Sequence, residues 1–108
     1  MGKNRDRVSI VAAILEAAYP GVTKTHIMVK ANLSFSLLEK YLEVVMGVGL
    51  VRVNGSTYHL TERGHEFLRE YKHFNSRYVL AQKLLDSLTY EREKLALICN
   101  DRVDILDF

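Results

Sequence analysis

Apolar side chains recur at alternating intervals of four and three residues over the last third of the chain. The series comprises Phe67, Tyr71, Phe74, Tyr78, Ala81, Leu85, Leu88, Leu95 and Cys99, and only Arg92 interrupts it. A mean interval of 3.5 residues aligns these side chains on one stripe of an α-helix, as in a coiled-coil seam. A helix from Thr61 to about Cys99 would be about 57 Å long at about 1.5 Å per residue. Residues 1–60 cannot cover such a length, so the far end is predicted to need a partner.

A second copy of the chain is the simplest partner, and a two-fold symmetric dimer is the commonest arrangement of two identical chains. The predicted dimer interface consists of Tyr71, Phe74, Tyr78, Ala81, Leu85, Leu88 and Leu95. The alternative is a break near residues 87–89, after which the helix folds back; Thr89 followed by Glu91 resembles a helix start and would allow it.

The first half of the chain predicts three short helices. Apolar residues at helical spacing mark a helix over residues 6–18, and Pro20-Gly21 ends it. Thr23 is a suitable N-cap for a second helix, which Asn32 can end because asparagine tolerates left-handed backbone geometry. Ser34 can cap a third helix that runs to Gly47 or Gly49. Two helices joined by so short a turn are typical of a helix-turn-helix motif.

A β-hairpin is predicted next. Asn54-Gly55 separates residues 50–53 from residues 56–60, and this dipeptide favours a type I′ turn, in which both central residues have positive φ. Thr61 then caps the final helix. The sequence therefore predicts a mainly α fold with a small β-hairpin wing, a winged helix-turn-helix over 1–60, a coiled-coil dimerisation helix over 61–99 and an acidic tail over 100–108.

The same elements carry a resemblance to a known family. The segments VGLV (48–51), Asn54-Gly55, YHLT (58–61) and Gly64 resemble the part of a winged helix that closes the third helix and forms the wing. More narrowly, KANLSF (30–35) and LEKYL (38–42) resemble the helix-turn-helix of a family of small archaeal DNA-binding proteins, and the resemblance covers about residues 5–85. The resemblance implies a winged helix followed by a long helix that dimerises as an antiparallel coiled coil. It also implies a double-stranded DNA binder, either a chromatin protein or a transcriptional regulator.

The third helix would lie in the major groove if the protein binds DNA in the usual way of this motif. Two apolar stripes predict that most of its surface is buried; they are Phe35, Leu38, Leu42 and Val45, and Leu37, Tyr41, Val44 and Val48. The remaining strip holds one lysine and two glutamates. Of these, Glu39 could accept a hydrogen bond from a cytosine amino group or could pair with a neighbouring cation.

The sequence offers more residues suited to contact DNA phosphates than residues suited to contact bases. The predicted DNA-binding residues are Arg5, Arg7, Lys24, Lys30, Ser34, Ser36, Lys40, Arg52 and Asn54. They lie at helix starts, on the polar side of the second helix and on the wing, where backbone N–H groups and cations suit an anion. The alternative is that these cations only solvate a small domain.

Overall charge supports DNA binding only weakly. Fifteen lysines and arginines against thirteen acidic residues give a formal charge of +2, which is far from strongly basic. The single cysteine, Cys99, cannot form an intramolecular disulfide. No segment has the length of apolar sequence that spans a bilayer and the first residues do not resemble a signal peptide, so we expect a cytoplasmic, nucleoid-associated protein.

Two Glu-x-x-His spacings, at Glu62 and His65 and at Glu70 and His73, are those of di-iron bundles. Both pairs lie off the seam and lack further carboxylate partners, so we expect no metal, no cofactor and no enzymatic activity. The predicted function is a homodimeric double-stranded DNA-binding protein. The alternative is a winged helix that binds another protein, because a fold alone does not fix its use.

Overall fold

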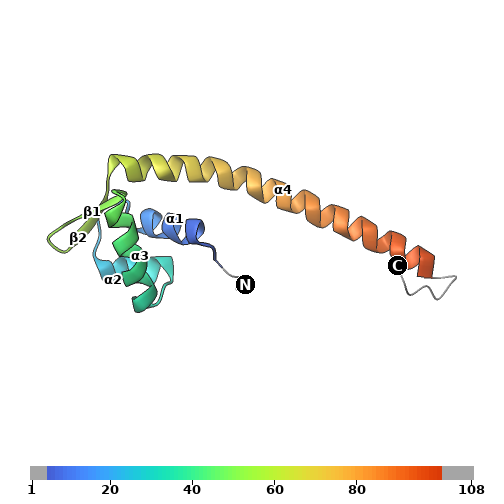
Figure 1. The fold of residues 1–108 in the computed structure, drawn as a ribbon, viewed down its shortest axis with the longest axis horizontal. Helices are drawn as coiled ribbons and strands as arrows, with labels where there is room; N and C mark the ends of the chain where they lie inside the picture. Colours follow the sequence, from blue (N-terminus) through green and yellow to red (C-terminus); the bar gives the residue numbers. More distant parts are fainter. Residues whose placement is uncertain (1–4, 101–108) are drawn as a thin grey trace. The chain divides into compact units, whose positions relative to one another are not determined.

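The computed structural model describes residues 5–100. Four helices and one hairpin follow each other in the predicted order (Figure 1): α1 (Arg7–Ala18), α2 (Lys24–Ala31), α3 (Phe35–Gly47), β1 (Val51–Asn54), β2 (Thr57–Leu60) and α4 (Glu62–Asn100). The fold class is therefore as predicted, a winged helix-turn-helix followed by a long helix. The predicted acidic tail after Asn100 lies outside the described residues.

Short polar side chains begin three of the helices. Asp6 accepts a hydrogen bond from the Ser9 N–H at 2.7 Å, and Thr23 and Ser34 do the same for the third residue of α2 and α3. These caps satisfy N–H groups that have no partner within a helix. At the other end of α2, Asn32 has φ 56° and ψ 56°, the predicted left-handed conformation. The caps at Thr23 and Ser34 and the exit at Asn32 are confirmed.

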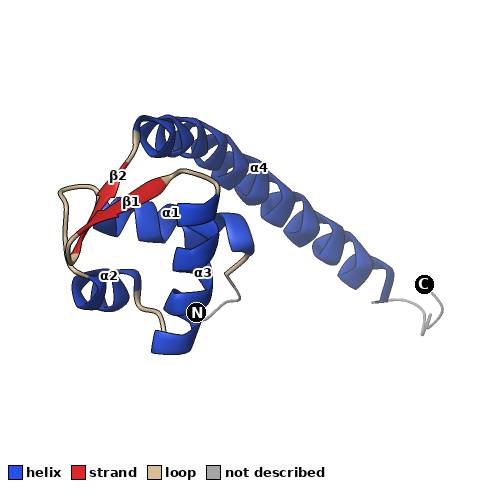
Figure 2. Cartoon of the chain, turned by 60° about the vertical axis from the view of Figure 1, so that its left-hand side comes forward, coloured by secondary structure: helices blue, strands red, loops and turns tan. Residues whose placement is uncertain are grey.

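The core of the first unit lies where α1, α2, α3 and the hairpin meet (Figure 2). Its largest fully buried side chains are Ile14, Leu15, Ile27, Leu38 and Val45. Each of the three helices contributes at least one of them, so none could bury its apolar face alone. Burial of each such side chain stabilises the fold by about 1.5–3 kcal/mol before conformational entropy is counted.

The hairpin turn differs by one residue from the prediction. Asn54 pairs with Thr57 at the end of the strands, so the two turn residues are Gly55 and Ser56. Gly55 has φ +66° and Asn54 does not have a positive φ. The predicted type I′ turn centred on Asn54-Gly55 is therefore wrong, and glycine at the first central position fits a type II′ turn. Pairing Asn54 in the ladder keeps Val51 and Leu60 opposite each other, and both face the core.

The first turn of α4 is fixed against the segment that follows α3. Thr61 donates from its hydroxyl to the Gly49 carbonyl, and its Oγ1 accepts from the Gly64 N–H at 3.0 Å, which confirms the predicted cap. At Gly64 a Cβ would lie 2.2 Å from the Leu50 carbonyl oxygen. The two backbones can approach this closely only because residue 64 has no side chain.

Helix α4 is continuous over its 39 residues, which corresponds to about 58 Å at about 1.5 Å per residue. The alternative break near residues 87–89 is therefore wrong. By its internal contacts the chain divides into two units, residues 1–72 and residues 73–108. None of the described helices combines the length and hydropathy that crossing a membrane requires.

Candidate nucleic-acid interface

The surface of α3 opposite the core carries more exposed apolar area than predicted. Leu38, Leu42 and Val45 are buried, but Phe35 is 58% exposed and Val44 and Val48 are each nearly half exposed. The prediction that most of α3 is buried is therefore wrong. Its buried stripe is one helix face wide, because only one side of α3 meets α1, α2 and β1.

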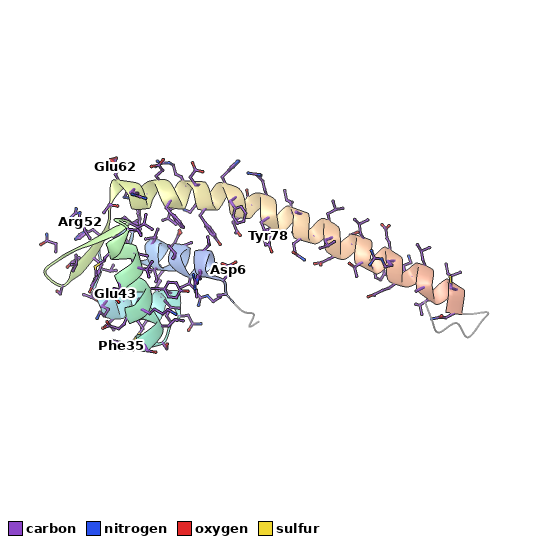
Figure 3. All side chains as sticks on the ribbon, viewed as in Figure 1. Asp6, Phe35, Glu43, Arg52, Glu62 and Tyr78 are labelled. Carbon is purple, nitrogen blue, oxygen red and sulfur yellow. The ribbon has the colours of Figure 1, made fainter. Side chains whose placement is uncertain are left out.

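A polar strip runs between these apolar residues on the exposed side of α3. It holds Ser36, Glu39, Lys40 and Glu43, all exposed. Figure 3 shows Phe35 at the start of α3 and Glu43 two turns later. The strip has two carboxylates and one ammonium group, so charge alone would not draw this face to phosphate.

Glu39 is engaged with the helix that precedes it. The Lys24 Nζ donates to Glu39 Oε2, and the same Nζ lies 5.2 Å from the centroid of the Phe35 ring. This hydrogen bond from Lys24 to Glu39 raises the pKa of the Lys24 ammonium above its ordinary value. Of the two roles considered for Glu39, pairing with a neighbouring cation is therefore the one present in the structure.

Two other predicted DNA-binding residues also have structural contacts. Arg5 donates to the carbonyl oxygens of Ala31 at 2.8 Å and of Asn32 at 3.2 Å, and so satisfies the C-terminus of α2. Ser34 Oγ accepts from the Leu37 N–H. The Ser34 contact is the predicted N-cap of α3, whereas the contacts of Arg5 were not expected, because Arg5 is 26 residues from Ala31 in the sequence.

The remaining predicted cations are exposed and lie on different elements. Arg7 begins α1 and Lys30 lies in the last turn of α2. Arg52 lies on β1 and is labelled in Figure 3. Lys40 lies 5.9 Å from the Tyr41 ring centroid. Among the described residues, none of these four cations has a salt-bridge partner. Asn54 is exposed beside the turn of the wing.

Sequence reasoning allowed Glu39 to pair with a neighbouring cation but did not identify Lys24 as that cation, nor its approach to Phe35. Lys24 and Glu39 are 15 residues apart, on different helices, so no helical spacing connects them. The available signal was the imbalance of charge on α3, which has two glutamates and one lysine, so that a cation from another helix would be attracted to it.

The predicted seam of α4 is exposed throughout the second unit. Leu85 is 56% exposed and Leu95 is 64% exposed, and Phe74, Tyr78 and Leu88 are each at least half exposed. Tyr71 belongs to the first unit, where it is half-buried and packs against the core. Cys99 is exposed. No group of three or more potential metal ligands occurs within residues 5–100.

The chain is similar to winged-helix proteins in two comparisons. A family model described as winged helix-turn-helix matches residues 4–79. Among curated proteins none matches. Among solved structures, Sso10a-2, a DNA-binding protein from Sulfolobus solfataricus, aligns with a TM-score of 0.60 and 21% identity, over 87% of this chain and 96% of that one. The multiple antibiotic-resistance repressor MarR from Listeria monocytogenes aligns with a TM-score of 0.57 and 17% identity, over 88% of this chain and 70% of that one. Both structures share the fold.

Proposed function

Because the chain belongs to a winged helix-turn-helix family, we propose that it is a homodimeric double-stranded DNA-binding protein of the small archaeal type. Its role would be that of a transcriptional regulator or an architectural chromatin factor in the nucleoid. In this proposal residues 1–60 bind DNA, residues 61–99 dimerise, and residues 100–108 form an acidic tail. We refer to residues 1–60 as the head.

The observation that carries the DNA-binding proposal is the set of exposed cations around α3. Lys30 on α2, Lys40 on α3 and Arg52 on the wing come from three elements, and none of them is held in a described salt bridge. In this motif α3 enters the major groove while the flanking elements contact the backbone. Such contacts fix position and add affinity without reading sequence.

Dimerisation is supported by the apolar surface of the second unit. Leucines that are half to two-thirds exposed on a single helix, at heptad spacing, have no cover within the described part of that unit. A second α4 would cover them at about 25 cal/mol per Å² of apolar area removed from water.

The seam residues favour an antiparallel pair. In a parallel pair Arg92 would face the partner's Arg92 in the seam. In an antiparallel pair centred near Lys83, Arg92 would instead lie opposite the partner's Phe74, and Arg77 would lie beside the partner's Glu91. Opposite charges flanking a seam set the orientation of the helices. Arginine over an aromatic ring is also favourable.

A titration of random-sequence duplex DNA at several salt concentrations tests the proposal. We expect affinity that falls steeply with salt, and Arg52→Ala should reduce the log–log slope by about 0.9 per head if Arg52 neutralises one phosphate. Lys83→Ala is the matched control, because it removes one cation from the second unit, and it should leave the slope unchanged. Binding that is absent or insensitive to salt would contradict the proposal.

A second candidate function is recognition of another protein. The exposure of Phe35 and Val44 on α3 and of Val48 directly after it, beside two glutamates, favours it, because apolar and acidic groups suit a basic peptide better than a phosphate backbone. In that case duplex DNA would bind no better than expected from net charge, and the three apolar residues would be the determinants of partner binding.

A further inference from the structure

The bridge between Lys24, Glu39 and Phe35 joins the two helices of the helix-turn-helix on their exposed side. Lys24 is the first residue of α2, and Glu39 lies in the second turn of α3. Their side chains are 35% and 46% exposed, so solvent and a ligand can reach both. The Phe35 ring also lies near the ammonium group, with its centroid 5.2 Å from Lys24 Nζ.

Lys24 differs from three other cations of the head in having a salt-bridge partner. Its charge is already compensated by a carboxylate, whereas Lys30, Lys40 and Arg52 have no salt-bridge partner within the described residues. The Lys24 ammonium has three N–H donors, so a phosphate must either share it with Glu39 or displace that carboxylate, and it gains the full charge of Lys24 only by displacing it. The carboxylate and the phosphate therefore compete for one cation.

Glu39 also occupies the strip that α3 would present to the major groove. Glu43 lies one turn further on the same strip and has no cation within salt-bridge distance among the described residues. Both carboxylates would approach the phosphates that border the groove and would be repelled by them. Only Glu39 additionally withholds a cation.

We propose that Glu39 limits the affinity of the head for nucleic acid by holding Lys24, as an internal competitor of the DNA phosphate. The proposal rests on the proposed function and specifies how strongly the same surface binds. Glu39 acts through Lys24 and is thus a positioning residue. Its removal should strengthen binding, the opposite of the effect expected for a residue that reads a base.

The test compares Glu39→Gln with the matched control Glu43→Gln. Each variant removes one negative charge from the same strip of α3, but only Glu39→Gln releases Lys24. For random duplex at low salt we expect Glu39→Gln to bind about fivefold tighter per head, because the released Lys24 can pair with a phosphate. Its log–log salt slope should be steeper by about 0.9 per head because one more phosphate is neutralised. Glu43→Gln should gain less than half as much affinity and should keep the wild-type slope.

The dependence on Lys24 is measured in the Lys24→Met background. There, Glu39→Gln should gain no more than Glu43→Gln. Circular dichroism and urea unfolding of every variant show whether the fold is retained. Equal gains for the two glutamine variants in the wild-type background would overturn the proposal. Weaker binding by Glu39→Gln would also overturn it and would indicate that Glu39 accepts a hydrogen bond from a base.

Elution from immobilised heparin separates this proposal from the proposed function. Heparin is a polyanion without grooves or bases, so it reports only the availability of cations. Glu39→Gln should elute at higher salt than Glu43→Gln even if no variant binds duplex DNA, a result that would remove the proposed function but keep the competition for Lys24. Identical elution of the two variants would remove the competition.

Discussion

At the scale of single residues, the conformation of Asn32 and the side chain of Arg5 control how α2 ends. Asn32 is the one non-glycine residue with positive φ in the described chain, and the Arg5 guanidinium binds the carbonyl oxygens of Ala31 and Asn32. Left-handed geometry costs most residues about 1–2 kcal/mol, and asparagine and glycine tolerate it best. The turn between α2 and α3 therefore depends on residue 32.

We expect Asn32→Ala to lower the free energy of unfolding by about 1–2 kcal/mol, since alanine must adopt the same left-handed conformation. Asn32→Gly should leave it unchanged or raise it. Urea denaturation followed by circular dichroism measures both. Equal stability of the two variants would show that the turn can relax to another geometry.

Arg5 and Arg7 form a second residue-scale comparison. Arg5→Ala removes two hydrogen bonds to helix-end carbonyls and should cost about 1 kcal/mol of stability. Arg7→Ala, which changes an exposed cation at the start of α1, should cost less than about 0.5 kcal/mol. Thermal unfolding of both variants tests this, and equal losses would mean that the contacts of Arg5 contribute nothing.

The residue-scale features that the sequence predicts are those that depend on near neighbours. Caps at Thr23, Ser34 and Thr61 act over three residues, so a local pattern is enough to find them. The contacts of Arg5 and Lys24 join segments 15 to 27 residues apart, and they depend on how the helices pack. No local pattern encodes that packing.

At the scale of elements, α4 and the hairpin show the same contrast between features that a local pattern predicts and features that packing decides. Heptad spacing predicted one long helix, and a 39-residue helix is present. The hairpin was predicted, but its turn was displaced by one residue, because turn propensity favoured Asn54-Gly55 while burial of Val51 opposite Leu60 set the register. Where two signals compete, core packing of a strand outweighs the preference of a turn.

Disruption of the α4 seam should abolish self-association. Leu85→Asp places a charge at the centre of the predicted seam, and sedimentation should give the mass of one chain. Ser87→Asp, which adds the same single negative charge away from the seam, should keep the mass of a dimer. If Leu85→Asp also sediments as a dimer, the seam is not the interface.

Charge exchange tests the orientation of the pair. Arg77→Glu and Glu91→Arg should each weaken the dimer, by about 0.5 kcal/mol per ion pair, and the double variant should regain wild-type affinity. In a parallel pair the two residues would be too far apart to couple, and the double variant would lose about the sum of the two single losses. Analytical ultracentrifugation over a concentration series measures the dissociation constants.

At the scale of the whole molecule, the proposal joins two weakly binding heads through one dimer. With about four phosphates neutralised per head, the log–log salt slope would be about −3.6 for one head and about −7 for two. Linked heads gain from effective concentration without any new contact. The monomeric Leu85→Asp variant should therefore bind DNA with about half the wild-type slope and much lower affinity. A slope equal to that of the wild type would mean that a single head accounts for binding.

The close approach at Gly64 restricts which sequences can adopt this fold. Any side chain there would collide with the Leu50 carbonyl oxygen, a main-chain atom that no rotamer change can move. At Gly47 a Cβ would meet no atom within 4 Å. In a library of all single substitutions, position 64 should accept glycine alone, whereas position 47 should tolerate alanine and serine. The choice of residue is thus strongly restricted at the junction where the wing passes into the long helix.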